Sequence, residues 1–432
     1  MTQEKSSSLL RQRVFGGLWA GSVASSIGSS AGLLAITWFV YASTGSAFDI
    51  ALVGIAGLAP RILFGVASGA LADRYGRLRV MLGADVLRAI TMILFAASIV
   101  LLKFQLPIVL TVAFLLGIGQ SLFRPAINAF LPTSVPRERL ASANGLFSVA
   151  QEITGIIGGP LGGFLIGVVG VAATIAFNGA SYLASGLFIV VVSMSITSKP
   201  SATSRNESPQ FLKQVREGFE YINRERGLMK LTIASFGANF FLSMFFTFLV
   251  IYVTDVLRQG SFVFGVLAAA SGAGFGVGSL LVSKTKAEVK FGIWFAVFWG
   301  AAGIGIFGLV LFPSTIASVL SVFIISACGG FGNTTFLTGV QKFVPNELLA
   351  RYLSLDEVGS IAASPAGQIA GGVIISTTGL GINYTIAAIG TAIFAFGLLL
   401  FPDVRALQIH SDSSKEQKQS ESDKYETGED AP

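Results

Sequence analysis

The sequence is poor in charge, cysteine and histidine. Only 12% of its 432 residues are charged, about half the fraction found in soluble domains, and 53% are hydrophobic. Cys328 is the single cysteine, so no intrachain disulfide can form, and it lies in an apolar run that favours a packing role. His410, the single histidine, lies in the polar stretch after the last apolar run. These shortages exclude a disulfide framework and make a histidine-based site inside the apolar runs impossible.

Motifs for nucleotide binding, metal binding and nucleophilic catalysis are also missing. The sequence contains no Gly-x-x-x-x-Gly-Lys-Ser/Thr loop, no His/Cys/carboxylate cluster with metal-ligand spacing, and no nucleophile elbow. We therefore expect no ATP-driven motor, no enzyme activity, no cofactor and no metal. The net charge of +6 comes from basic residues scattered over many short loops, which indicates membrane topology and not nucleic-acid binding.

Apolar runs dominate what is present, and each is long enough to cross a bilayer, which takes about 20 residues. We predict an all-α membrane protein with twelve transmembrane helices, split six and six by the longest polar stretch. The predicted spans are 14–41, 48–72, 79–102, 106–130, 143–168, 171–194, 230–256, 262–283, 289–312, 315–340, 354–376 and 380–401.

These spans divide the chain into five parts. A cytoplasmic arm (1–13) precedes the first bundle (14–194), a linker (195–229) leads to the second bundle (230–401), and a polar tail (402–432) follows. Within the linker, Phe211, Val215, Phe219 and Ile222 fall on one helical stripe, which predicts a surface amphipathic helix. The tail is rich in Ser, Lys and Glu and is predicted to be disordered.

The positions of the basic residues test this topology. With the N-terminus in the cytoplasm, the lysines and arginines fall in the arm, in the loops after even-numbered spans, or in the tail, with the exceptions Arg61, Arg88, Lys103, Arg124 and Arg258. This asymmetry is what the positive-inside rule predicts. We expect a multi-pass protein of a cell membrane of the bacterial inner-membrane type, with both termini cytoplasmic.

An internal repeat relates the two halves. The pattern Val-Pro-x-Glu-x-Leu-Ala at 135–141 recurs 209 residues later at 344–350, and the paired glycines at 162–163 recur at 371–372. Parallel six-span halves are typical of transporters that rock about a substrate site near mid-membrane.

The loop after the second span carries the most specific pattern, Gly69-x-x-x-Asp73-Arg74-x-Gly76-Arg77. It is very similar to the signature between helices 2 and 3 of the major facilitator superfamily, which the chain resembles over nearly its whole membrane-embedded length. Residues 84–89, 123–126 and 131–144 resemble the branch that contains macrolide-efflux and siderophore-export proteins. The resemblance implies two pseudo-symmetric six-helix bundles, the major facilitator fold, and secondary transport of a small molecule.

The acid and arginines of this loop suggest a cytoplasmic gate. Arg74 and Arg77 can pair with acids at the start of the eleventh span, and Asp73 can meet a helix N-terminus or an arginine. We interpret the loop as a latch that holds the outward-facing state and breaks on opening inward. Alternatively, the arginines only enforce topology and bind anionic headgroups. The predicted gate residues are Gly69, Asp73, Arg74, Gly76, Arg77, Asp356 and Glu357.

Charges inside the spans are the candidates for coupling, because a charge in the bilayer usually faces a cavity or a partner. Asp85 and Arg88 are three residues apart on one helix and are expected to form a structural pair. Glu152 is the only mid-depth acid without a partner on its own helix, and Arg124 and Arg61 are its expected partners. A carboxylate that switches between an arginine and water can load and release a proton, so we hypothesise that Glu152 couples transport to protons. The alternative is a static buried ion pair.

The resemblance also shows where standard coupling positions are absent. Ala113 occupies the helix-4 position at which antiporters of the superfamily often carry an arginine, and Ser29 follows Gly28 where relatives often place an acid. A shortened form of the helix-5 antiporter motif remains, and its small residues favour close packing between the halves. Its members are Gly155, Gly159, Pro160, Gly162 and Gly163.

By the same resemblance, helices 1, 4, 7 and 10 line the substrate cavity. The candidate lining residues are Ser29, Trp38, Gln120, Asn128, Asn239, Phe240 and Asn333. Their neutral and aromatic character suits a bulky, largely apolar solute such as a macrolide-like drug.

These observations predict a secondary active exporter of a hydrophobic or amphiphilic small molecule, working by proton antiport with alternating access. The expected partners are the small-molecule substrate, the proton and the lipid bilayer, with no nucleic acid, and a monomer is expected. The alternatives are a siderophore or lysolipid transporter, a proton-independent facilitator, or a membrane sensor or scaffold that does not transport.

Overall fold

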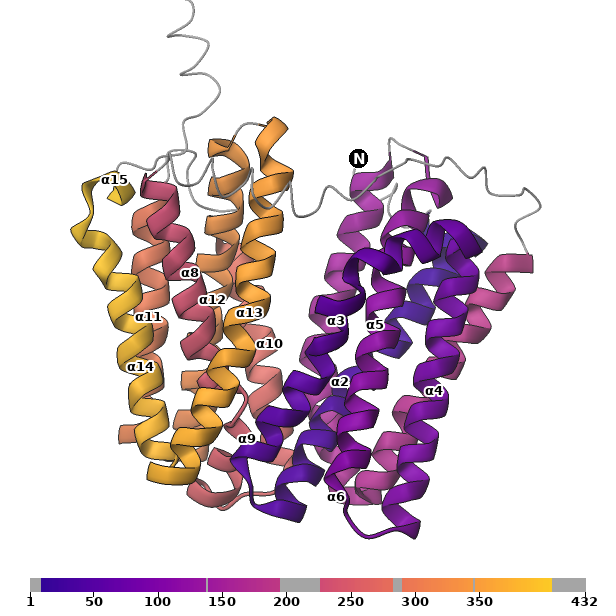
Figure 1. Cartoon of the computed structure of the whole chain (residues 1–432), viewed down its shortest axis with the longest axis horizontal. Helices are drawn as coiled ribbons and strands as arrows, with labels where there is room; N and C mark the ends of the chain where they lie inside the picture. Colours follow the sequence, from indigo (N-terminus) through magenta and orange to yellow (C-terminus); the bar gives the residue numbers. More distant parts are fainter. Residues whose placement is uncertain (1–8, 137–138, 195–225, 283–289, 345, 406–432) are drawn as a thin grey trace, which may run out of the picture.

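The computed structural model describes residues 9–136, 139–194, 226–282, 290–344 and 346–405 (Figure 1). Within these ranges the regular secondary structure is entirely helical, with no strand. The helices form two bundles that stand side by side, one from each half of the chain (Figure 1). The predicted amphipathic helix and nearly all of the predicted tail lie outside the described residues.

The described part of the N-terminal bundle contains five helical elements. They are α2 (Arg13–Thr44), α3 (Ala47–Tyr75), α4 (Arg77–Leu101), α5 (Leu106–Ser134) and α6 (Leu140–Met194). Element α6 covers two predicted spans, and Gly170 interrupts its helical backbone with φ 85° and ψ 170°. Because L side chains rarely adopt such a positive φ, glycine is what permits the break.

The C-terminal bundle holds the remaining elements. They are α8 (Arg226–Phe246), α9 (Leu249–Ile251), the π-helix η2 (Tyr252–Val256), α10 (Ser261–Val282), α11 (Phe291–Leu311), α12 (Thr315–Phe343), α13 (Asn346–Thr378), α14 (Leu380–Phe396), the 3-10 helix η3 (Gly397–Leu400) and α15 (Pro402–Arg405). The first residues of the predicted tail form α15, because Lys230 of α8 binds Asp403 and Val404 is buried.

In the described part of the chain, nine helices are long and apolar enough to cross a membrane. One of them is α6, which holds two predicted spans, while α3 and α13 match predicted spans without being among the nine. The all-α membrane architecture is therefore confirmed, and the count of twelve spans stays a prediction.

Residue Gly76 of the signature loop has a clear structural role. It has φ 90°, it ends α3 and it immediately precedes α4. A side chain at this φ would be strained, so the glycine allows the short connection between two antiparallel helices.

The two bundles meet mainly through two helix pairs, α6 with α10 and α3 with α13, and α2 adds smaller contacts with α9, η2 and α10. The α3–α13 contact lies near the start of α3 and the end of α13, where a Cβ on Gly372 would lie 3.2 Å from the backbone of Phe48. The ribbons of the bundles approach at this end and stand apart at the other end, which carries the N-terminus and α15 (Figure 1). We call the first end the closed end.

Candidate functional site

A pocket of about 350 Å³ lies within the C-terminal bundle. Four helices contribute to its wall, namely α8, α10, α11 and α12. Its lining residues are Asn239, Leu242, Phe246, Ser271, Phe275, Trp299, Ile325, Ser326, Gly329 and Asn333. Asn239 and Asn333, two residues predicted to line a cavity, are thus brought together in one pocket.

A second polar surface runs along α5. Gln120, Arg124 and Asn128 are all exposed, and their spacing of four residues places them on one helical face. Exposed polar and charged side chains in the middle of an apolar span are costly against lipid, so this row is suited to a water-filled space. The assignment of this helix to a cavity between the halves stays a prediction.

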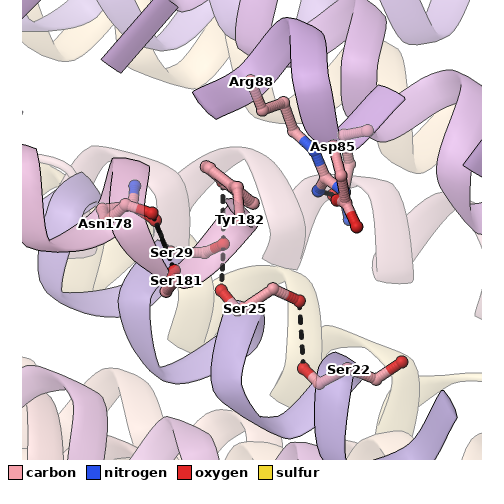
Figure 2. A network of polar contacts seen from close by, with 9 residues as sticks. Ser22, Ser25, Ser29, Asp85, Arg88, Asn178, Ser181 and Tyr182 are labelled. Carbon is pink, nitrogen blue, oxygen red and sulfur yellow. Dashed lines mark hydrogen bonds and ion pairs between the residues drawn. The ribbon is translucent and has the colours of Figure 1, made fainter. Parts of the chain in front are cut away.

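The other predicted cavity residues contact protein groups. The Ser29 hydroxyl is 2.8 Å from the Tyr182 hydroxyl inside the N-terminal bundle (Figure 2). Trp38 stacks on Phe264 of the other bundle, with ring centroids 6.3 Å apart. Phe240 packs edge-to-face on its neighbour Phe241. The candidate set therefore divides between the pocket, the α5 surface and the packing of the bundles.

Asp85 and Arg88 form a buried ion pair on α4, in the arrangement expected from their spacing (Figure 2). The Arg88 guanidinium lies over the rings of Phe123, at 4.7 Å, and Tyr182, at 4.4 Å. These cation–π contacts supply attraction that compensates part of the cost of burying the charge. The same side chain donates to Gln120 Oε1 at 3.2 Å, which joins the buried pair to the exposed row on α5.

Sequence reasoning missed the glycine and aromatic residues that accommodate Arg88. A Cβ on Gly119 of α5 would lie 2.4 Å from Arg88 Cγ, so only glycine leaves room for this side chain. In the sequence, only the Gly117-Ile-Gly119 pattern indicates a close contact on this helix. Arg88, the side chain that Gly119 accommodates, lies on α4, and no local spacing connects the two residues.

The predicted coupling residues are placed only in part. Arg124 is exposed on α5 and Arg61 is half-buried on α3. The side chain of Glu152 lies outside those that the structure describes. The proposed pairing of Glu152 with either arginine stays a prediction.

The predicted cytoplasmic gate is likewise placed in part. Arg77 Nη1 donates to the Ala129 carbonyl of its own bundle at 2.6 Å, and the Arg74 guanidinium lies 5.4 Å from the centre of the Tyr75 ring. Asp356 is half-buried on α13. The surroundings of residue 69 and of the side chains of residues 73 and 357 are outside what the structure describes. The latch stays a prediction.

The closed end contains a polar contact between bundles that the sequence did not reveal. The Tyr41 hydroxyl of α2 donates to Asp255 Oδ2 of η2 at 2.5 Å. Six residues after Asp255, the Ser261 hydroxyl at the start of α10 donates to the Gly163 carbonyl of α6 at 3.0 Å. The two hydrogen bonds join the bundles at this end.

The glycines of the predicted helix-5 motif lie at close contacts. A Cβ on Gly159 would lie 2.7 Å from Ala268 Cβ, and one on Gly163 would lie 2.4 Å from the Ser261 carbonyl oxygen, both on α10. Gly162 instead faces α2, at 2.8 Å from Ala31 Cα. Gly155 is approached from α10, where a Cβ on Gly272 would lie 3.1 Å from its carbonyl carbon. The absence of side chains allows α6 and α10 to approach backbone to backbone.

The family model described as "Transmembrane secretion effector" matches residues 5–428. Macrolide efflux protein A of Streptococcus pyogenes is 26% identical over 407 residues, covering 91% of this chain and 96% of that protein. A protein described as a bacilysin exporter in Bacillus subtilis is 25% identical over 298 residues, covering 67% of this chain and 71% of that protein.

A solved structure supports the same fold. The inward-facing, unoccupied form of a bacterial homolog to the human lysosomal transporter Spinster aligns with a TM-score of 0.67 and 16% identity. The alignment covers 92% of this chain and 94% of that one.

Proposed function

The chain belongs to the transmembrane secretion effector family of the major facilitator superfamily, and we propose that this membrane transporter exports a hydrophobic or amphiphilic small molecule. The observation that carries the proposal is the mid-helix pocket lined by neutral polar and aromatic side chains. Such a wall suits an apolar skeleton with a few polar groups. The names of the similar proteins, a macrolide efflux protein and a bacilysin exporter, support export as the direction.

Alternating access is the proposed mechanism. The bundles contact each other near one end, where Tyr41 and Asp255 are hydrogen-bonded. The positive-inside pattern supports a cytoplasmic position for the opposite end. In this proposal the structure has the inward-facing arrangement, with both termini cytoplasmic, and the latch formed by the signature loop is broken. Re-forming that latch closes the cytoplasmic end while the contacts at the closed end separate.

Proton antiport is the proposed energy source. As the bundles rock, Glu152 would release its proton and then pair as a carboxylate with Arg124 or Arg61. This exchange would couple proton movement to substrate movement. Glu152→Gln removes the titratable group at nearly constant volume. Uptake driven by a pH gradient into inverted vesicles should then be lost, and full retained uptake would show that Glu152 is a static packing partner.

Export itself is tested by uptake of radiolabelled erythromycin into inverted membrane vesicles, with and without a protonophore. We expect uptake above that of vesicles lacking the protein and collapse of the excess on protonophore addition. Uptake that resists the protonophore indicates a facilitator. Uptake of a siderophore or lysolipid in place of the drug changes the substrate class, and no flux of any of these probes favours a sensor or scaffold.

A further inference from the structure

The pocket in the C-terminal bundle has a chemical preference that its residues define. None of the described residues that line it is charged, yet five carry hydrogen-bonding side chains, namely Asn239, Ser271, Trp299, Ser326 and Asn333. We propose that this pocket is a subsite for the uncharged, oxygen-bearing part of the exported molecule: a ketone, ester or ether on an apolar skeleton. The inference rests on the proposed export function and specifies its substrate class.

The indole of Trp299 is the most specific feature. Trp299 is only 6% exposed, it lines the pocket, and its Nε1 has no hydrogen-bond partner among the described residues. An indole N–H can only donate, and a buried donor without an acceptor is costly. Because Nε1 is shielded from solvent and lies against Gly332, an oxygen acceptor on a ligand satisfies it only if the indole or α12 shifts on binding. A ligand ammonium, which has only donors, could not satisfy it in any position.

Gly332 of α12 determines where this indole lies. A Cβ at that position would be 2.4 Å from Trp299 Nε1. The glycine therefore lets the indole N–H edge lie directly against α12, one residue from Asn333 and three from Gly329, both of which line the pocket.

The remaining polar groups are neutral and partly satisfied. Asn239 Nδ2 donates to the Ser235 carbonyl at 3.0 Å, which leaves its second N–H and its carbonyl oxygen for other partners. The hydroxyls of Ser271 and Ser326 lie 2.9 Å apart and bind each other across α10 and α12. An ion that entered this wall would lose hydration without gaining a counter-charge, so the pocket selects against fixed charge.

Size and depth define a subsite and not a complete site. The volume of about 350 Å³ is near the lower end of the range for small-molecule sites, about 300–1,000 Å³. Asn239, Ser271 and Trp299 each lie near the middle of their helices, where parallel-repeat transporters bind substrate. A macrolactone-sized molecule would place one part here and its remainder outside the pocket. The charged side chain of the α5 row, Arg124, belongs to the other bundle.

The test uses the full chain in lipid nanodiscs and two probes with a related lactone ring. Erythronolide B is uncharged, while erythromycin carries an amino sugar that is cationic at pH 7. Binding is measured by isothermal titration calorimetry. Trp299→Phe should weaken the binding of erythronolide B at least tenfold, because an aromatic side chain remains at residue 299 but the indole N–H is lost. The matched control is Trp294→Phe on the same helix, since Trp294 packs on Phe298 and Phe331 and does not line the pocket.

A second variant covers the case in which Trp299→Phe folds poorly. Asn333→Asp places a carboxylate in the wall and should shift the preference from erythronolide B toward erythromycin at least tenfold. If erythronolide B does not bind, or if Trp299→Phe and Trp294→Phe lose the same affinity, the subsite assignment is overturned. Vesicle uptake distinguishes the subsite assignment from the export proposal. If erythromycin is taken up but the pocket variants do not change binding, export stands and the subsite assignment is overturned. If binding depends on Trp299 but no probe is transported, the subsite assignment stands and the export proposal is overturned.

Discussion

At the scale of single residues, Arg88 shows how this bundle contains a charge inside an apolar span. Its guanidinium binds Asp85, donates to Gln120 and lies over two aromatic rings, so attraction comes from four side chains on three helices. Asp85 and Arg88 are 1% and 3% exposed. A pair this buried is held by mutual compensation, because either charge alone would remain desolvated.

Removing one partner of this pair should therefore cost more than removing both. We expect Arg88→Met to destabilise the protein by about 3–5 kcal/mol, because it leaves the Asp85 carboxylate buried without its cation. The double variant Asp85→Asn/Arg88→Met should recover part of that loss. Thermal unfolding in detergent measures both variants, and Lys103→Met, at an exposed residue, is the control. A double variant less stable than Arg88→Met would argue against mutual compensation.

At the scale of helices, α6 and α10 form the contact about which the bundles would turn in the proposed rocking mechanism. Glycines on both helices remove side chains from the interface, so the two backbones approach closely. No large side chains interdigitate at these positions, and small changes of tilt do not require them to repack. We call this glycine-lined contact the α6–α10 pivot.

The pivot predicts a difference between two glycines one helical turn apart. A Cβ on Gly163 would lie 2.4 Å from the Ser261 carbonyl oxygen, whereas one on Gly167 would lie 3.8 Å from the Ser261 hydroxyl. Gly163→Ala should thus separate the helices and lower the initial rate of vesicle uptake at least tenfold, while Gly167→Ala should leave it within twofold. Equal rates for the two variants, at equal protein levels, would mean that this contact does not limit transport.

The short helix α15 predicts a pH effect on stability. Lys230 donates to Asp403 at 2.5 Å, and this hydrogen bond lowers the pKa of Asp403 from its usual value. A lowered pKa stabilises the folded state above the ordinary pKa of aspartate, about 3.9, and the benefit disappears as pH falls through the lowered value. We expect Asp403→Asn to lower Tm slightly at pH 7 and to match the unsubstituted protein near pH 2. High salt at pH 7 should also reduce the difference, because the pair is partly exposed and therefore screened. A difference that persists at pH 2 would point to packing.

At the scale of the whole molecule, the arrangement of the two bundles follows from where they contact each other. The closed end is joined by hydrogen bonds and by the contact of α3 with α13. Transport by rocking requires this end to separate.

A disulfide across the closed end tests this requirement. A Cβ on Gly372 would lie 3.4 Å from Ala51 Cβ, close to the separation of about 3.5–4.5 Å in disulfides. We expect Ala51→Cys/Gly372→Cys, made in a Cys328→Ser background, to lose vesicle uptake on oxidation and regain it on reduction. Each single-cysteine variant is the control. Undiminished uptake by the fully cross-linked protein would contradict the rocking mechanism.

Much of this architecture could be predicted from the sequence, for reasons that particular residues make clear. Apolar runs of spanning length and the loop around Gly76 identify the membrane fold, and Asn239 and Asn333 were placed in one cavity by family resemblance. Trp299, Ser271 and Phe275 were missed. In a membrane helix both the lipid-facing and the core-facing sides are apolar, so no amphipathic pattern marks the side that lines a pocket. The Tyr41–Asp255 hydrogen bond was missed because residues so far apart in the chain leave no local pattern.

One helix connects the pocket to the pivot. Gly265 and Gly272 of α10 lie against α6, while Ser271 and Phe275 of the same helix line the pocket. Ser271 directly precedes Gly272, so the two surfaces lie on neighbouring faces of α10, about 100° apart around the helix. In the proposed rocking mechanism, a molecule bound in the pocket would therefore contact the same helix that moves against the other bundle. Binding would act on this interface through α10 itself, without a chain of intervening side chains.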